Sequence, residues 1–406
     1  AAVVPLPPPR TVTCRTRIEP WDDGGVARAA AAAAAQGQCV LCIANTVDRA
    51  QSWYRAVRSA SPAAAFETGL LHARFPLFRR EELEARWVGA LGRDGERPRG
   101  CVLVATQIAE QSIDIDADFL ISELAPADML LQRLGRLWRH TRATRPCDTP
   151  RIVVVAAGDP AAAGDREEAA EFLGRGNCRV YAPYVLARTH EVWRRLHHVR
   201  LPGDIRPIIE ATYKEAGEGE RALMAGLRED MRRRAQRLAA CAESAADDTF
   251  GMPVGSDDEE SAPTRYSDLP RTNVLLVRAV DAPDPSCARI TLLNGEKVVA
   301  DAKCRDGRVT RQLHCNLAPV ASHLLPAEFP PAPWLKKHFF RPPPVLTWSA
   351  GDVVLRAGDA DTLLGYRPDL GLFRLDRGSD AAIPDLSPAD GDSRAAAPLD
   401  LARNDW

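Results

Sequence analysis

The stretch CVLVATQIAEQSIDIDADFLISELAPADMLLQRLGRLWRH, residues 101–140, contains two short apolar runs and a leucine-rich segment dense in arginine. The runs 101–107 and 118–123 are of the type found in strands that are buried on both faces of a sheet. In the segment 130–140, leucines and cations recur at helical spacing. Buried strands followed by a helix indicate βαβ units and a parallel sheet.

Apolar runs of the same type lie on both sides of this stretch, and segments with helical spacing separate them. These runs are 39–44, 66–73 and 151–158. Together they predict an α/β fold with a parallel sheet that helices cover on both faces. Ligands of such sheets bind at the carboxyl ends of the strands. The polar residues at these ends are Asn45, Thr46, His72, Thr106, Gln107 and Glu123.

Changes in composition divide the rest of the chain. We expect an entry strand or linker, the α/β lobe, a helical connector, a flexible acidic linker, a small β-rich accessory domain and a disordered tail. In that order, the expected segments are 1–22, 23–158, 159–244, 245–269, 270–378 and 379–406.

Charge and cysteine usage exclude several classes of protein. The net charge of −2 excludes a positive field over the whole chain, so a nucleic-acid site must be a local patch. No apolar run reaches the roughly 18 residues of a membrane span, and no signal peptide is recognisable, so we expect a cytoplasmic protein without a membrane partner.

Ten scattered cysteines suggest reduced thiols. Cys39 and Cys42 form a C-x-x-C inside an apolar run, which favours buried thiols over a metal or redox site.

The segment 130–140 predicts a cationic helix face. Gln132, Arg136, Arg139 and His140 stand at i, i+4, i+7 and i+8, and Arg133 flanks them. Guanidinium groups without carboxylate partners favour a polyanionic ligand such as a phosphate chain. The alternative is a solvated face, or arginines that pair with Asp114, Asp116 and Asp118. The ligand hypothesis fails if carboxylates of the same fold neutralise the arginines.

The whole stretch resembles motifs V and VI of superfamily 2 helicases. Its amino-acid sequence is most similar to that of the CRISPR-associated helicase–nuclease of type I systems. The segments VLCIANTVDRAQSWYRAV and LLHARFPLFRREELE resemble motifs IV and IVa of that family, and the resemblance extends over about 40–215. It implies that 23–158 is a second RecA-like helicase lobe, within the C-terminal half of an ATP-dependent single-stranded DNA translocase coupled to a nuclease in antiviral defence.

The resemblance also implies roles for individual residues. Arg136 and Arg139 match arginine fingers that reach the γ-phosphate, and Gln132 matches a neighbour of the phosphate or the catalytic water. The implied nucleotide-binding residues are Asp114, Arg133, Arg136 and Arg139. The implied contacts to the nucleic-acid backbone are Asn45, Thr46, His72, Arg74, Phe75, Thr106 and Gln107. Trp138 is expected to pack in the core.

Several patterns that the family requires do not occur in this sequence. It contains no G-x-x-x-x-G-K-[ST] phosphate loop, no D-E-x-H acid and no histidine followed by aspartate. We therefore expect ATP and Mg²⁺ to be held mostly by a first lobe, and the nuclease metal to lie outside this chain. The chain alone should be inactive.

The expected partners are single-stranded DNA, the first lobe with its HD-type nuclease, and the guide-RNA surveillance complex. The first lobe would lie on a missing N-terminal half or on a separate subunit. Two alternatives stay open: another superfamily 2 helicase acting on DNA or RNA, and a non-catalytic nucleic-acid-binding or docking module.

Overall fold

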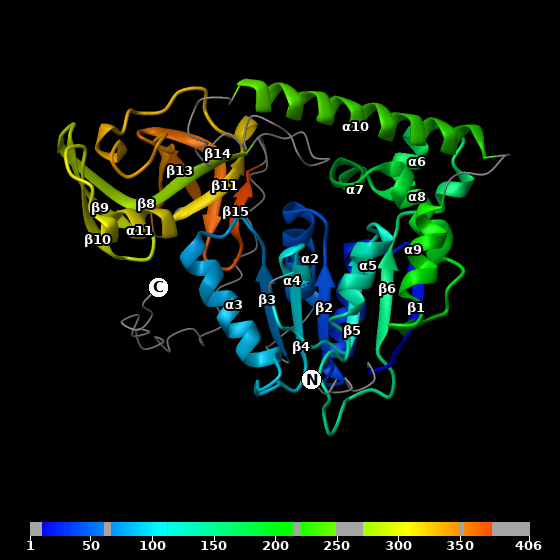
Figure 1. The fold of residues 1–406 in the computed structure, drawn as a ribbon. Helices are drawn as coiled ribbons and strands as arrows, with labels where there is room; N and C mark the ends of the chain where they lie inside the picture. Colours follow the sequence, from blue (N-terminus) through cyan, green and yellow to red (C-terminus); the bar gives the residue numbers. More distant parts are fainter. Residues whose placement is uncertain are drawn as a thin grey trace, which may run out of the picture. The chain divides into compact units, whose positions relative to one another are not determined.

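The computed structural model describes residues 10–60, 66–111, 113–214, 220–248, 271–349 and 353–375. Two sheets organise these residues (Figure 1). The first sheet has the strand order β3-β4-β2-β5-β6-β1-β7. Its strands are parallel except for β7, which pairs antiparallel with β1. The strands are β1 (Val12–Glu19), β2 (Cys39–Ile43), β3 (Glu67–Leu71), β4 (Cys101–Ala105), β5 (Phe119–Glu123), β6 (Arg151–Val155) and β7 (His198–Leu201).

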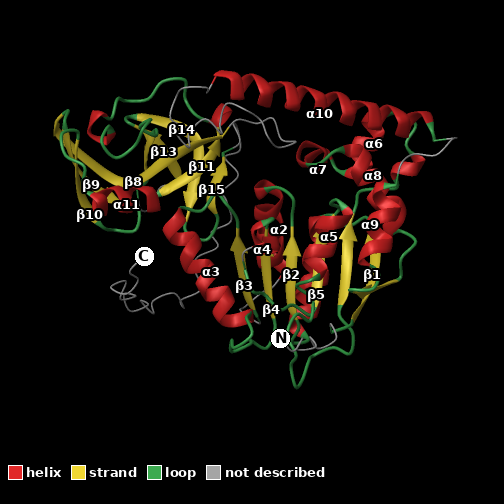
Figure 2. Cartoon of the chain, viewed as in Figure 1, coloured by secondary structure: helices red, strands yellow, loops and turns green. Residues whose placement is uncertain are grey.

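Burial explains the central strands. Every residue of β2, β4 and β5 is buried, as their continuous apolar runs predict for a sheet covered on both faces. Helices lie on both sides of this sheet (Figure 2). They are α1 (Asp23–Ala35), α2 (Val47–Ala60), α3 (Leu77–Leu91), α4 (Ile108–Gln111) and α5 (Ala127–Leu134). The predicted α/β fold class is confirmed.

The segment after β6 is mostly helical, but it also returns one strand to the first sheet. Its helices are η1 (Pro160–Ala162), α6 (Arg166–Leu173), α7 (Arg175–Val180), α8 (Pro183–Trp193), α9 (Ile205–Tyr213) and α10 (Ala222–Asp248). β7 was not expected. Its four residues are too few to show a sequence pattern, yet Val199 is fully buried where the strand pairs with β1.

α10 extends to Asp248 and so enters the segment 245–269 that was expected to be a linker. The remainder of that linker, and the expected tail 379–406, lie outside the described residues.

The second sheet belongs to the expected accessory domain. Its order is β10-β9-β8-β12-β13-β14-β15, and β11 also pairs with β8. Its strands are β8 (Arg271–Asp284), β9 (Cys287–Leu292), β10 (Lys297–Asp301), β11 (Leu317–Ala321), β12 (Val345–Thr347), β13 (Val354–Ala357), β14 (Ala360–Arg367) and β15 (Gly371–Arg374). Helix α11 (Gly307–Cys315) and the short turns η3 (Ser322–Leu324) and η4 (Pro333–Leu335) accompany it. Two apolar clusters fill its faces, one around Leu276 and Leu346 and the other around Ile290 and Leu335.

Candidate nucleotide and nucleic-acid site

The arginine segment is not one helix. α5 ends at Leu134, and the chain turns at Gly135. Leu137 then forms a parallel bridge with Ala117, and Trp138 adopts a positive φ of 47°. Main-chain hydrogen bonds on either side hold this bridge: Ala117 N–H donates to the Arg136 carbonyl at 2.9 Å, and Trp138 N–H donates to the Ala117 carbonyl at 3.0 Å. The predicted helical face of Gln132, Arg136, Arg139 and His140 is therefore wrong.

Arg133 is fully buried within its own fold. Its Nε donates to the Glu110 carboxylate at 2.7 Å, and its terminal nitrogens donate to Ser122 Oγ at 2.7 Å and Asn45 Oδ1 at 2.8 Å. A buried guanidinium needs such partners, because desolvation of an unpaired charge is costly. All of these donors are engaged and solvent is excluded. The assignment of Arg133 to nucleotide binding is therefore wrong for this structure.

Asn45 belongs to the same buried network. Its side-chain amide donates to the carbonyl of Leu124 and to Asn177 Oδ1, both at 2.8 Å, and its backbone N–H donates to Glu123 at 2.6 Å. Burial raises the pKa of the Glu123 carboxyl, although the Asn45 amide opposes this effect. With only 3% of its surface exposed, Asn45 cannot serve as the expected nucleic-acid contact. Its role is to connect β2, β5 and α7.

Arg136 is buried but keeps its charge without a carboxylate partner in the described part of the chain. One terminal nitrogen donates to the backbone carbonyl of Glu110, and its buried Nε has no hydrogen-bond partner. Burial, and then the neighbouring Arg139 cation, lower the pKa of Arg136. Asp114 and Glu110 act on this cation through space. Among the three motif arginines, however, Arg136 alone has no carboxylate within ion-pair distance in the described part of the chain.

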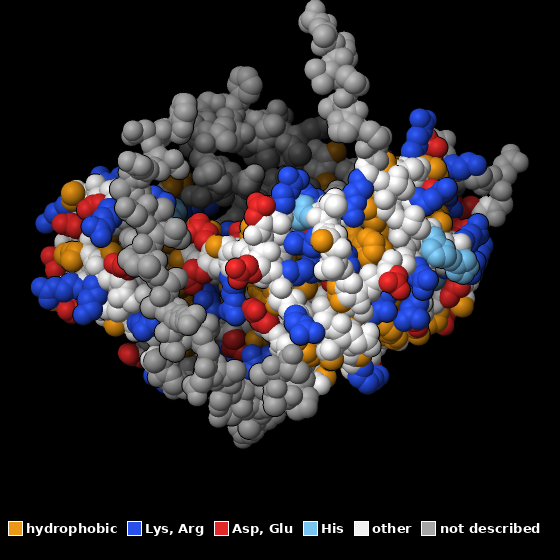
Figure 3. Space-filling view, turned by 90° about the horizontal axis from the view of Figure 1, so that it is seen from below, with side chains coloured by type: hydrophobic (Ala, Val, Ile, Leu, Met, Phe, Trp, Pro, Cys, Tyr) orange, Lys and Arg blue, Asp and Glu red, His pale blue; other side chains and the backbone are white. Residues whose placement is uncertain are grey.

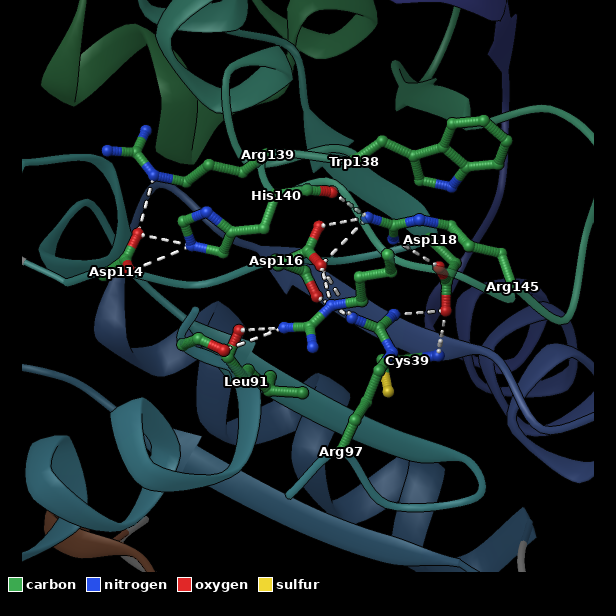
Figure 4. A network of polar contacts seen from close by, with 12 residues as sticks. Cys39, Leu91, Arg97, Asp114, Asp116, Asp118, Trp138, Arg139, His140 and Arg145 are labelled. Atoms are coloured by element: carbon green, nitrogen blue, oxygen red, sulfur yellow. Dashed lines mark hydrogen bonds and ion pairs between the residues drawn. The ribbon is translucent and has the colours of Figure 1, made fainter. Parts of the chain in front are cut away.

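Arg139 and His140 share the carboxylate of Asp114 (Figure 4). Arg139 Nε lies 2.7 Å from Asp114 Oδ1, and His140 Nε2 lies 2.9 Å from Asp114 Oδ2. Although desolvation opposes it, the hydrogen bonds from Arg139 and His140 lower the pKa of Asp114. Both side chains of the Arg139–Asp114 pair are about 40% exposed, at 42% and 39%. Exposed ion pairs contribute only about 0–1 kcal/mol, so this one can exchange for another anion.

Gln132 lies on the last turn of α5, and its side chain is exposed to solvent. None of the described residues forms a hydrogen bond with its side-chain amide, so the amide donor and acceptor are accessible on the same segment as Arg136.

A second ion network lies beside the motif segment, and the sequence analysis did not find its cations. Asp116 and Asp118 are fully buried and pair with Arg97, Arg142 and Arg145 (Figure 4). Arg97 and Arg145 each contact both carboxylates, and Arg145 lies 3.0 Å from each of them. The alternative that Asp114, Asp116 and Asp118 pair with the motif arginines is therefore confirmed for Asp114, which pairs with Arg139. It is wrong for Asp116 and Asp118, because loop arginines occupy them. No periodicity marks these loop cations, so only the two acids within an apolar run hinted at the network.

His72 and Phe75 are buried beneath the turn before β15. His72 Nε2 lies 3.0 Å from the Leu370 carbonyl, and the His72 ring stacks on Phe75 with centroids 4.5 Å apart. Burial lowers the pKa of His72 to about 3, so the ring is neutral. The expectation that these two residues contact nucleic acid is wrong. Arg74 is partly exposed, and its guanidinium pairs with Asp48.

Thr46, Thr106 and Gln107 lie at the carboxyl ends of β2 and β4, where a ligand of the sheet would bind. Thr46 Oγ1 accepts the Arg49 N–H at the start of α2, and Gln107 Nε2 donates to the Asn45 carbonyl at 2.9 Å. Thr106 is 4% exposed, so only a small part of its surface is accessible. Their contact with nucleic acid stays a prediction.

The structure also bears on the expectations for the C-x-x-C cysteines and for a membrane span. Cys39 and Cys42 are free thiols, both fully buried in β2. Among the described helices, none combines the length and apolarity that a membrane span requires.

Residues 36–142 match the family model described as CRISPR-associated nuclease/helicase Cas3, C-terminal. By this match the chain is similar to the C-terminal part of Cas3 proteins. The match includes β2 to β5, α5 and the arginine segment discussed above.

Cas3 proteins of known sequence and structure agree with this placement. The endonuclease/helicase Cas3 of Thermus thermophilus is 29% identical over 418 residues, which cover 83% of this chain and 42% of that protein. The Cas3 of Escherichia coli is 48% identical over 115 residues, which cover 28% of this chain and 13% of that protein. The ATP-bound structure of T. fusca Cas3 superposes with a TM-score of 0.64 and 26% identity, over 91% of this chain and 43% of that chain. The chain thus spans less than half the length of these Cas3 relatives.

Proposed function

We propose that this chain is the C-terminal part of an ATP-dependent single-stranded DNA translocase that is coupled to a nuclease in CRISPR interference. In this proposal it supplies arginine fingers and DNA-backbone contacts, and a first helicase lobe supplies the rest of the ATP site. Similarity to the C-terminal part of Cas3 proteins supports the proposal.

The observation that carries the proposal is the unneutralised guanidinium of Arg136. A buried cation without a carboxylate partner is costly to keep unless an anion binds there. The turn after α5 fixes its backbone, so the group is positioned before any ligand arrives. Charge spreads over the phosphoryl oxygens in the transition state of phosphoryl transfer, and a preplaced guanidinium stabilises it.

Arg139 would be the second finger. Its exposed pair with Asp114 holds the side chain near Arg136 until a stronger anion replaces the carboxylate. Asp114 would keep its hydrogen bond to His140 when Arg139 leaves. Gln132 would orient a phosphate oxygen or a water molecule through its exposed amide.

ATP and Mg²⁺ would be held mainly by the first lobe. The residues of this chain fit only the γ-phosphate end of the nucleotide, since they offer cations but no glycine-rich loop. Bound ATP supplies the phosphoryl group, and the residues of this chain supply positive charge and orientation. The chain alone is then inactive as an ATPase and as a nuclease.

Single-stranded DNA would cross the carboxyl edge of the first sheet. Thr46, Thr106 and Gln107 offer hydroxyl and amide groups there, which suit phosphate contacts that do not read sequence. A chain in a structure described as a CRISPR RNA-guided surveillance complex, pre-nicking, superposes with a TM-score of 0.59 and 25% identity. It supports a surveillance complex as the further partner, and a cytoplasmic location would follow.

The test is Arg136→Ala in this chain combined with the first lobe. ATP turnover should fall by roughly 10³-fold or more, because a finger is lost, while binding of a fluorescein-labelled oligothymidylate stays within twofold. Arg206→Ala is the matched control, since that arginine is exposed and pairs only with Glu210 on α9.

Three results would contradict the proposal. Parallel loss of turnover and DNA binding would indicate a structural role for Arg136. Unchanged turnover would favour the docking module. Tighter binding of RNA than of DNA by the same pair would favour another superfamily 2 helicase.

A further inference from the structure

Helix α11 and the segment 336–341 form one surface of the second sheet's domain. Thr310 Oγ1 lies 2.7 Å from His338 Nδ1, and the His314 ring stacks on Phe339 with centroids 4.5 Å apart. We call the exposed side chains on these two segments and on the loop before α11 the α11 surface. It consists of Lys303, Arg305, Arg308, Arg311, Lys336, Lys337, Phe340 and Arg341.

None of the cations of the α11 surface has an ion pair among the described residues. Exposed arginines elsewhere commonly pair with a carboxylate one helical turn away, as Arg206 does with Glu210 and Arg233 with Glu229. Lysine is also concentrated here: three of the five lysines of the chain, Lys303, Lys336 and Lys337, belong to this surface. In an arginine-rich chain of net charge −2, this is a local excess of positive charge.

Acids lie near these cations, among them Asp284, which interacts with Lys303 through space, but none forms an ion pair with them among the described residues. The Asp306 carboxylate accepts the backbone N–H of Arg308 at 2.7 Å as the N-cap of α11, and the Asp301 carboxylate accepts the backbone N–H of Lys303 at 2.7 Å. Glu81 of α3 lies near the far end of α11, beside Cys315. Figure 3 shows blue Lys and Arg atoms along the left margin of that view, with red atoms between them, over the part of the molecule that holds β9, β10 and α11.

Phe340 adds an aromatic ring to this charge. It is 81% exposed, the largest fraction among the exposed large hydrophobic side chains that the structure describes. An exposed ring contributes no burial free energy to folding, but it can contribute to the binding of a ligand that covers it. Cations beside an exposed aromatic ring match the two needs of an unpaired nucleic-acid strand, which presents phosphates and free base faces.

We propose that the α11 surface is a second binding site for single-stranded nucleic acid, separate from the carboxyl edge of the first sheet. Its cations contact successive phosphates, and Phe340 stacks on one base. The inference goes beyond the proposed function, because it assigns strand binding to the accessory domain rather than to the helicase lobe.

The first experiment removes charge. The triple variant Arg308→Gln, Lys336→Gln, Lys337→Gln should bind a fluorescein-labelled oligothymidylate roughly tenfold or more weakly at about 50 mM salt, measured by anisotropy. The slope of log K against log salt should become shallower by about 2, because each lost phosphate contact of a single strand removes about 0.7. The matched control is Arg206→Gln, Arg233→Gln, Arg356→Gln, which removes three exposed but paired cations and should change neither quantity.

The second experiment separates stacking from charge. Phe340→Ala should weaken binding of the oligothymidylate roughly tenfold and leave the salt slope unchanged, because stacking releases no counterions. Phe340→Trp should restore binding. The affinity for a hairpin duplex with the same number of phosphates should be the same for Phe340→Ala as for the parent chain.

Other outcomes would overturn the inference. If the triple variant binds the oligothymidylate like its control, the occupant is not nucleic acid. If it instead loses an acidic protein partner or anionic vesicles, the surface serves that partner. Thr106→Val tests the contact on the helicase lobe separately. If the proposed function fails, the expected losses of binding for the triple variant and for Phe340→Ala do not change, so the two proposals can fail independently.

Discussion

Arg133 shows how a single side chain can satisfy a helicase motif and yet be structural. Its guanidinium is surrounded by Glu110, Ser122 and Asn45, which come from α4, β5 and the end of β2. The neighbouring Arg136 is held by one backbone carbonyl and no carboxylate. Arg133 thus stabilises the fold, whereas Arg136, three positions later, is available to an anion.

Arg133→Ala should lower the free energy of unfolding by about 3–5 kcal/mol, because it leaves the Glu110 carboxylate buried without its partner. Urea unfolding followed by far-UV circular dichroism measures this change. Arg206→Ala, at an exposed site, should change it by less than about 0.5 kcal/mol. An equal midpoint for Arg133→Ala and the parent chain would show that the network contributes nothing to stability.

At the scale of elements, the turn that begins β15 docks on the first sheet. Gln51 Nε2 of α2 donates to the carbonyls of Leu370 and Leu372, both at 2.8 Å, and the Leu372 N–H donates to the Arg74 carbonyl at 3.1 Å. Gly371 makes this approach possible. It has a φ of 68°, and a Cβ there would lie 2.9 Å from the His72 ring and 3.0 Å from the Arg74 carbonyl.

Gly371→Ala should therefore destabilise the chain by about 2–4 kcal/mol, the sum of left-handed strain and overpacking. Gly295→Ala is a matched control with a φ of 91° and no atom within 4 Å of the added Cβ, so it should cost only about 1–2 kcal/mol. Equal losses in thermal or urea unfolding would mean that the docking contact is not tight.

At the scale of the whole molecule, His72 connects stability to pH. It is fully buried between the end of β3 and the turn before β15, and burial lowers its pKa to about 3. The unfolded chain, with a histidine pKa near 6.5, binds a proton below that pH and the folded chain does not. This contribution is complete above pH 6.5 and is lost as the pH falls toward 3.

His72→Gln keeps a donor for the Leu370 carbonyl but cannot titrate. The free energy of unfolding of the parent chain should therefore fall relative to that of His72→Gln by up to about 1.4 kcal/mol for each pH unit below about 6. Urea unfolding at pH 7, 6 and 5 measures the difference. Parallel pH profiles for the two chains would show that His72 is not buried as a neutral ring.

The sequence predicted elements better than side-chain partners. The strands β2, β4 and β5 could be recognised because burial on both faces requires continuous apolar runs in the sequence. The strand β7 is only four residues long and shows no such pattern. The end of α5 was missed because the bridge between Leu137 and Ala117 is a contact between residues distant in sequence. The partners of Arg133 lie 11, 23 and 88 residues away, so no spacing rule could identify them.

The main-chain bridge between Ala117 and Leu137 also has an evolutionary consequence. Because its hydrogen bonds join backbone atoms, the location of Arg136 does not depend on the chemical identity of the side chains at 117 and 137. Homologues can exchange those side chains for others of similar volume and still keep the cation in the same place. Proline at 117 is the exception, because it would remove the amide hydrogen on which the arrangement relies.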